Sequence, residues 1–90
     1  MSAKQGQVII VNKLGLHARA ASKFVGLANQ YPCDVFLAVE DREVNAKSIL
    51  GVLMLAAAKG TQLSLRCEGT QADEAYDALS GLVADGFGET

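Results

Sequence analysis

The chain has 90 residues, of which half are hydrophobic and a fifth are charged, and its formal net charge is -2. This composition is too apolar for a disordered protein, and it lacks the basic excess or the run of Lys and Arg that binding to nucleic acid requires. No stretch approaches the roughly 20 apolar residues of a membrane span, so we expect no membrane insertion and a cytoplasmic protein.

The first half of the chain predicts strand, helix and strand in turn. Val8–Asn12 is a β-branched run that predicts a first strand, ended by the turn-prone residues 12–15. From Ala18 to Gln30 apolar residues recur at the three-and-four spacing of a helix with one buried face, and Tyr31-Pro32 ends it. Residues 33–40 then alternate between apolar and polar, which predicts a strand with one buried face.

The middle of the chain predicts a turn, a short strand and a short helix. The polar residues 40–43 indicate a tight turn, and residues 44–45 begin a returning strand. Ser48 stands where an N-cap belongs, ahead of the apolar run 49–55. We expect Lys59-Gly60 to close this helical unit, because a cation and a glycine are typical of a helix C-terminus.

The last third predicts one more strand and one more helix. Residues 62–68 alternate between apolar and polar, and Thr70 with Asp73 resembles a capping box for a helix that runs to about Asp85. Residues 86–90 are expected to be a short tail. The order of elements predicts a single α+β domain over residues 1–90, with a four-stranded antiparallel sheet and three helices packed on one face.

Two cysteines, Cys33 and Cys67, stand far apart in the sequence, without a neighbouring histidine or the spacing of metal ligands. If the strands that carry them lie side by side and antiparallel, the two residues come nearly opposite each other on the core face. We expect free, buried thiols and no metal site.

The residues that indicate chemistry surround the only histidine, His17, in the stretch Gly15-Leu16-His17-Ala18-Arg19. A glycine turn brings this histidine to the first turn of a helix, where the backbone amides of Ala18 and Arg19 have no internal partner and favour an anion such as phosphate. A neutral imidazole is a nucleophile near pH 7, and an arginine stabilises phosphoryl charge. A phosphoryl group on nitrogen is reactive enough to be passed on. Taken alone, a single histidine is more often an ordinary helix-start residue.

Three separated motifs resemble the histidine-containing phosphocarrier family HPr of the bacterial sugar phosphotransferase system, and the resemblance covers nearly the whole chain. These motifs are residues 14–21, residues 45–55 and Ala58-Lys59-Gly60. The resemblance implies an open-faced βαββαβα sandwich that is not an enzyme and needs no cofactor. It also implies that His17 is phosphorylated on Nδ1 by enzyme I, with phosphoenolpyruvate as the ultimate donor, that Arg19 is the active-site arginine, and that enzyme IIA domains accept the group.

The resemblance gives Ser48 a second role, because the family's serine at this position is phosphorylated by HPr kinase/phosphorylase in many bacteria. A phosphate there would add negative charge to a surface that docks acidic partners. The alternative is an ordinary N-cap worth about 1 kcal/mol, and the two roles are compatible. The apolar run after Ser48 is expected to be partly exposed for docking, with Ile49 and Leu50 the first candidates and Leu53 beside them.

The sequence departs from the family pattern at two places. Ala20 stands where proline often follows the active-site arginine, which costs a helix start little. Gly26 and Asn29 stand where well-studied enteric members carry lysines that contact acidic partners, and Lys23 is the expected substitute for docking.

Three alternatives stay open beside a monomeric carrier for sugar uptake. The acidic tail at residues 86–90 resembles the nitrogen-related branch of regulatory phosphocarriers. A different class would be a protein-binding module that uses the apolar short helix and never carries phosphate. A hydrolase is the weakest, because the sequence has no second histidine, no cysteine-histidine pairing and no acidic metal cluster.

Overall fold

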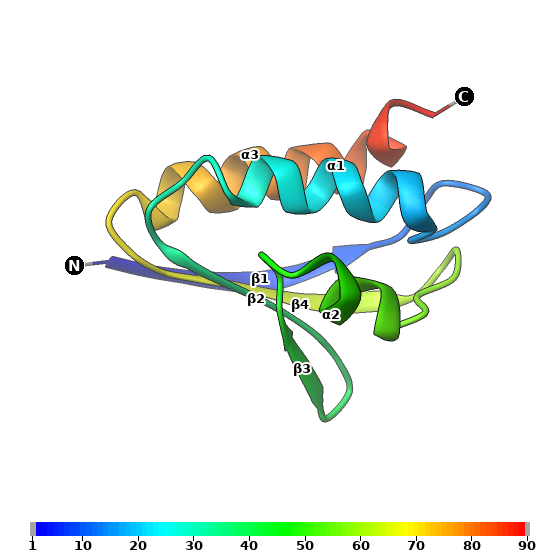
Figure 1. Cartoon of the computed structure of the whole chain (residues 1–90), viewed down its shortest axis with the longest axis horizontal. Coiled ribbons are helices and arrows are strands. Elements are labelled where there is room, and N and C mark those ends of the chain that lie inside the picture. Colours follow the sequence, from blue (N-terminus) through cyan, green and yellow to red (C-terminus); the bar gives the residue numbers. More distant parts are fainter. Residues whose placement is uncertain (1, 90) are drawn as a thin grey trace.

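A computed structural model describes residues 2–89 of the protein and confirms the predicted α+β architecture. The elements are β1 (Ser2–Ile9), α1 (Ala18–Ala28), β2 (Asp34–Val39), β3 (Arg42–Asn45), α2 (Ile49–Met54), β4 (Gln62–Gly69), α3 (Ala72–Ala84) and a last 3-10 turn, η1 (Gly86–Gly88) (Figure 1). Within residues 2–89 no helix is long and apolar enough to cross a membrane.

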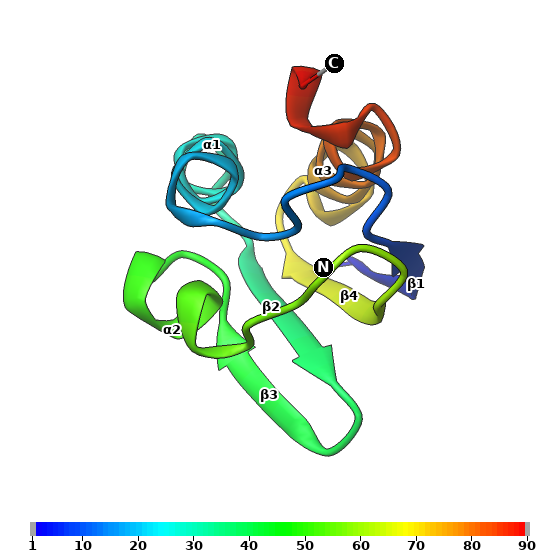
Figure 2. The same ribbon diagram turned by 90° about the vertical axis from the view of Figure 1, so that its right-hand side faces the viewer.

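The four strands form one antiparallel sheet in the order β1-β4-β2-β3. β4 is the last strand in the chain but lies inside the sheet, where Leu65 is opposite Gly6 of β1 on one side and Leu37 of β2 on the other. Figure 2 shows α1 and α3 above one face of the sheet, and α2 packs against α1 and β3. The strand and helix order is therefore βαββαβα.

The core lies between the sheet and the helices, and it follows from the predicted periodicities. On β4 the alternating residues Leu63, Leu65 and Cys67 are buried while their neighbours are not. Each large apolar side chain buried in this way stabilises the fold by roughly 1.5–3 kcal/mol. The largest side chains that are almost fully buried are Phe24, Phe87, Ile10, Leu37, Leu63, Leu65 and Leu79.

Both cysteines are free and buried, as expected. β2 and β4 pair antiparallel, and Cys67 is opposite Val35, two residues from Cys33. Burial, together with the nearby Cys33 thiol, raises the pKa of the Cys67 thiol to about 11. At neutral pH Cys67 is therefore an unreactive thiol.

The prediction for the first strand was wrong at both ends. β1 begins at Ser2 and ends at Ile9, rather than spanning Val8 to Asn12. Its polar first half forms a strand because its backbone pairs with β4, with Ser2 opposite Gly69, while most of its side chains stay in solvent at the edge of the sheet. Asn12 is instead a buried residue at the start of a turn whose next two residues are exposed.

The turn and the helix in the middle of the chain are both shorter than predicted. Residues 40–41 alone make the turn, with Glu40 at φ 55°, and β3 starts at Arg42. α2 ends at Met54 instead of reaching Lys59-Gly60, because Ala56 takes a left-handed conformation at φ 50°. The Arg42 side chain donates to the Met54 and Leu55 carbonyl oxygens at 3.5 and 3.4 Å, which satisfies the end of this helix.

The last helix lacks the predicted capping box. Gln71, at φ 64°, occupies the N-cap of α3 without a side-chain hydrogen bond, so Thr70 lies one residue too early to cap Ala72. The tail prediction was also wrong for most of its length. Phe87 is buried in the core within η1, and Glu89 folds back to the start of α1; Thr90 lies outside the described residues.

Candidate functional site

The site begins with a tight turn that only glycine fits. Gly15 has φ 69°, and a Cβ on it would lie 2.5 Å from the Ala57 carbonyl oxygen and 3.0 Å from Ala58 Cα. The next amide, that of Leu16, donates to the same Ala57 oxygen at 2.8 Å, and the Leu16 side chain is buried. The turn is thus attached to the segment before β4, and His17 follows at a fixed place.

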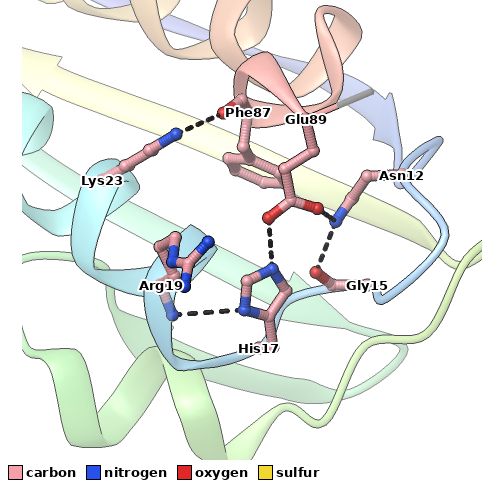
Figure 3. Close-up of polar contacts among 7 residues, drawn as sticks. All are labelled: Asn12, Gly15, His17, Arg19, Lys23, Phe87 and Glu89. Atoms are coloured by element: carbon pink, nitrogen blue, oxygen red, sulfur yellow. Dashed lines mark hydrogen bonds and ion pairs between the residues drawn. The ribbon is translucent and has the colours of Figure 1, made fainter.

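His17 is the N-cap residue of α1, and its ring nitrogens have different partners. The Arg19 backbone N–H donates to His17 Nδ1 at 3.3 Å, while Nε2 pairs with the Glu89 carboxylate (Figure 3). Because a backbone N–H can only donate, Nδ1 is the acceptor and the neutral ring carries its proton on Nε2. The lone pair on Nδ1 therefore lies at the amino terminus of the helix, where the helix dipole favours an incoming anion.

Glu89 is held by a second partner as well as by the histidine. The Asn12 amide donates to Glu89 Oε1 at 2.9 Å and to the Gly15 carbonyl oxygen at 2.7 Å. The hydrogen bond from Asn12 lowers the pKa of the Glu89 carboxyl below its usual value of 4.5, and the hydrogen bond with His17 is the second cause. Glu89 is thus a carboxylate at neutral pH, in contact with the proton-bearing nitrogen of His17.

A cavity of about 1080 Å³ opens beside His17, and several cations line it. Arg19 is exposed, and within residues 2–89 no hydrogen bond or ion pair engages its side chain. Lys13 and Lys59 also reach this cavity, as does Lys23, whose Nζ donates to the Phe87 carbonyl oxygen at 2.8 Å. The surroundings of Nδ1 are therefore suited to an anionic group that arrives from solvent.

The short helix presents an apolar surface. Ile49 and Leu50 are exposed, at 41% and 71% of their full area, while Leu53 is half-buried against the core. Met54 and Leu14, which sequence reasoning did not single out, are exposed at 71% and 69%. Exposed apolar side chains of this size on a small domain are typical of a protein-docking surface.

Ser48 caps α2, as predicted. Its hydroxyl accepts a hydrogen bond from the Gly51 N–H at 3.3 Å, and its side chain is exposed to solvent. The hydroxyl is therefore accessible to a modifying enzyme while it also satisfies one amide of the helix.

Sequence reasoning found His17 and Arg19 but not the four residues that complete their surroundings: Asn12, Lys13, Lys59 and Glu89. Asn12 was assigned to the end of the first strand and the turn after it, Lys13 to that turn, Lys59 to a helix end and Glu89 to a tail. The aromatic Phe87 between two glycines was the available signal that the tail is folded, since a disordered tail has no need of a buried aromatic residue. Within residues 2–89 no group of three or more His, Cys, Asp or Glu is placed to hold a metal ion.

Comparison with known proteins gives consistent matches. Residues 4–85 match the family model described as the PTS HPr component phosphorylation site. The phosphocarrier protein HPr of Pseudomonas aeruginosa is 54% identical over 84 residues, which are 92% of this chain and 93% of that protein. The phosphocarrier protein NPr of Shewanella violacea is 40% identical over 89 residues, 99% of this chain and 98% of that protein. The crystal structure of HPr-C-His from Thermoanaerobacter tengcongensis superposes with a TM-score of 0.93 at 38% identity, over 97% of this chain and 98% of that one.

Proposed function

The chain belongs to the HPr family and is a phosphocarrier protein of the phosphotransferase system rather than an enzyme, and from this premise we propose that His17 Nδ1 carries the phosphoryl group. The observation that carries the proposal is the arrangement of the ring: Nδ1 has its lone pair at the amino terminus of α1, and Nε2 holds the proton against Glu89. A nucleophilic nitrogen is thus aimed at an anion-binding site.

In the proposed reaction phosphorylated enzyme I, charged from phosphoenolpyruvate, is the donor and an enzyme IIA domain is the acceptor. The Nδ1 lone pair attacks phosphorus, a nitrogen–phosphorus bond forms on His17, and the bond to the donor nitrogen breaks with its electron pair going to the donor. As the bond to phosphorus forms, the Arg19 N–H exchanges its hydrogen bond with Nδ1 for one with a phosphoryl oxygen, and the Ala18 amide and the Arg19 guanidinium also stabilise the phosphoryl oxygens. The reverse step discharges the group to the acceptor. We therefore propose that the chain acts in the cytoplasm, where both proposed partners work.

The proposed docking surface combines the apolar and the basic side chains around His17. Ile49, Leu50 and Leu53 supply its apolar part, and Lys23 supplies one cation beside the site. Phosphorylation of Ser48 by an HPr kinase/phosphorylase would add about two negative charges at the start of α2 and weaken the docking of an acidic partner. The serine hydroxyl is exposed, which this step requires.

The nitrogen-related branch is the second candidate, because the NPr of Shewanella violacea matches almost the entire chain. The higher identity to an HPr supports the sugar-uptake branch. The two candidate functions share the chemistry at His17 and differ in the partner proteins. Labelling by the enzyme I of the sugar system, compared with labelling by the enzyme I paralogue of the nitrogen system from the same organism, separates them by rate.

The central test is transfer of label from phosphoenolpyruvate through enzyme I of the same organism. Wild type should gain close to one base-stable, acid-labile phosphoryl group per chain, and His17→Ala should gain none. Arg19→Ala should be labelled more slowly while keeping the wild-type fold. A wild type that stays unlabelled would refute the carrier and favour a binding module that acts through α2. Ser48 is tested with ATP and the cognate kinase, where mass analysis should place an acid-stable phosphate on this residue in wild type and none on Ser48→Ala.

A further inference from the structure

The last described residues of the chain form a strap across the start of α1; we call residues 86–89 the C-terminal strap. Phe87 anchors it, with only 1% of its area exposed. A hydrogen bond also holds the C-terminal strap to α1, because Lys23 Nζ donates to the Phe87 carbonyl oxygen at 2.8 Å. The strap is thus fixed to the core and to α1 before it reaches His17.

Its last contact places Glu89 between two partners, as Figure 3 shows. Oε1 accepts from Asn12, and Oε2 meets His17 Nε2. Asn12 is 6% exposed, and its amide nitrogen also donates to the Gly15 carbonyl oxygen. Turning this amide over would set its oxygen against two other oxygens, so the orientation of Asn12 is fixed and the carboxylate is fixed with it. The glycine turn, the strap and the histidine ring thus form one connected network.

We infer that Glu89 is a positioning residue for phosphoryl transfer, which holds the proton of His17 on Nε2 so that Nδ1 alone can attack. This inference rests on the proposed function of His17. A neutral imidazole has two tautomers, and a carboxylate that accepts from one ring nitrogen selects the tautomer in which the other nitrogen has the lone pair. The same task falls to the aspartate of a Ser-His-Asp triad. Here the ring nitrogen left free is the nucleophile itself.

Glu89 also balances charge when the bond forms. The Nδ1 lone pair goes into the new bond to phosphorus, the donor nitrogen leaves with its electron pair, and Nε2 keeps its proton. The ring of His17 becomes a cation, and the carboxylate already in contact with Nε2 pairs with it. No proton has to leave the site in either direction of transfer.

Glu89 also has an effect that opposes positioning: its carboxylate lies near the incoming phosphoryl group, and the two negative charges repel each other. The two effects predict opposite signs for removal of Glu89. If positioning dominates, a variant without the carboxylate accepts phosphate more slowly; if repulsion dominates, the variant accepts it faster. The network through Asn12, which orients the carboxylate toward Nε2, favours positioning.

The experiment uses the full chain with ¹⁵N-labelled histidine and follows the single ring by NMR at a pH where it is neutral. Wild type should show mainly the Nε2–H tautomer. In Glu89→Ala only the long hydrogen bond from the Arg19 N–H to Nδ1 still favours this tautomer, so its share should fall. The variant should accept phosphate from enzyme I on the order of 10-fold more slowly, the lower end of the loss seen when the outer hydrogen-bond partner of a metal-ligating histidine is removed. Glu89→Gln keeps an acceptor oxygen but not the charge, so it should retain the tautomer and transfer at an intermediate rate. Asp85→Asn removes a carboxylate from the same end of the chain without touching His17, and it should match wild type in both measurements.

The outcomes separate this inference from the proposed function. If wild type is not phosphorylated on His17, the proposed function fails, and the tautomer measurement alone then decides whether Glu89 orients the ring. If wild type is phosphorylated but Glu89→Ala has the wild-type tautomer ratio, or transfers as fast as wild type or faster, the positioning role is wrong while the carrier stands. Unfolding curves for each variant confirm that the measured chains are folded.

Discussion

Replacing Gly15 by alanine tests whether the glycine turn sets the position of His17. Alanine at φ 69° costs about 1–2 kcal/mol, because its Cβ crowds the backbone in the left-handed region. The new Cβ also lies 2.5 Å from the Ala57 carbonyl oxygen, so the segment must move and strain the Leu16 hydrogen bond, which costs roughly 0.5–1.5 kcal/mol more. Reduced freedom of the unfolded chain offsets about 0.4–1 kcal/mol. The net loss should be about 2 kcal/mol.

Gly26→Ala is the matched control for this substitution. Gly26 lies within α1, and a Cβ there meets no atom within 4 Å. The same chemical change should therefore stabilise the protein, by about 0.5–1 kcal/mol, because alanine is a better helix former than glycine. Two identical substitutions are thus expected to change the free energy of unfolding in opposite directions.

Urea unfolding of wild type and the two variants measures these free energies, against a total of roughly 5–13 kcal/mol expected for a domain of this size. Phosphoryl transfer from enzyme I should also be slower for Gly15→Ala, because His17 moves with the turn. The chemical step of this transfer should proceed at the wild-type rate for Gly26→Ala. A Gly15→Ala variant within 0.5 kcal/mol of wild type, or one that accepts phosphate at the wild-type rate, would refute the argument that this turn fixes the nucleophile.

Substitutions at three other positions and one labelling experiment also follow from the structure. Phe87→Ala should cost about 3–5 kcal/mol in urea unfolding, since it empties a buried aromatic site; a cost under 1 kcal/mol would mean that the strap is not part of the core. Ser48→Ala should cost about 1 kcal/mol, whereas Ser48→Asp should keep the cap yet slow transfer from enzyme I, and equal rates would argue against charge control of docking. Wild type should be more stable than Glu89→Gln above about pH 4.5, and the difference should vanish as the pH falls through the lowered pKa of the folded-state Glu89 carboxyl; a difference that persists in strong acid would contradict the assigned hydrogen bonds of the carboxylate with Asn12 and His17. With a pKa of about 11, Cys67 is about one part in a thousand thiolate at pH 8, so iodoacetamide should alkylate it readily only after unfolding, and rapid alkylation of the native chain would disprove its burial.

The parts of the fold that were predictable from sequence depend on near neighbours. The buried face of α1 follows from spacings of three and four residues, and the Ser48 cap bonds an amide only three residues away. The alternation on β4 likewise needs no knowledge of its partners. Each of these signals is local, because the physical cause lies within one or two turns of the chain.

The parts that sequence reasoning missed depend on distant partners. The polar start of β1 is a strand only because β4 lies beside it, and Ser2 and Gly69 are 67 residues apart. The contact of Glu89 with His17 spans 72 residues, and the one with Asn12 spans 77. No periodicity in the tail encodes these contacts. They arise once the sheet and α3 have brought the end of the chain to the start of α1.

The geometry around His17 also suits the proposed transfer, in which one residue serves two partners in succession. The His17 side chain lines the cavity and is 26% exposed, and Arg19 is exposed beside it. An enzyme that kept a reactive intermediate for itself would enclose it and exclude water. A carrier must instead present the same nitrogen to a donor and then to an acceptor. The positioning of Nδ1 is therefore expected to come from within the chain, through Glu89, while the exclusion of water is left to whichever partner covers the site.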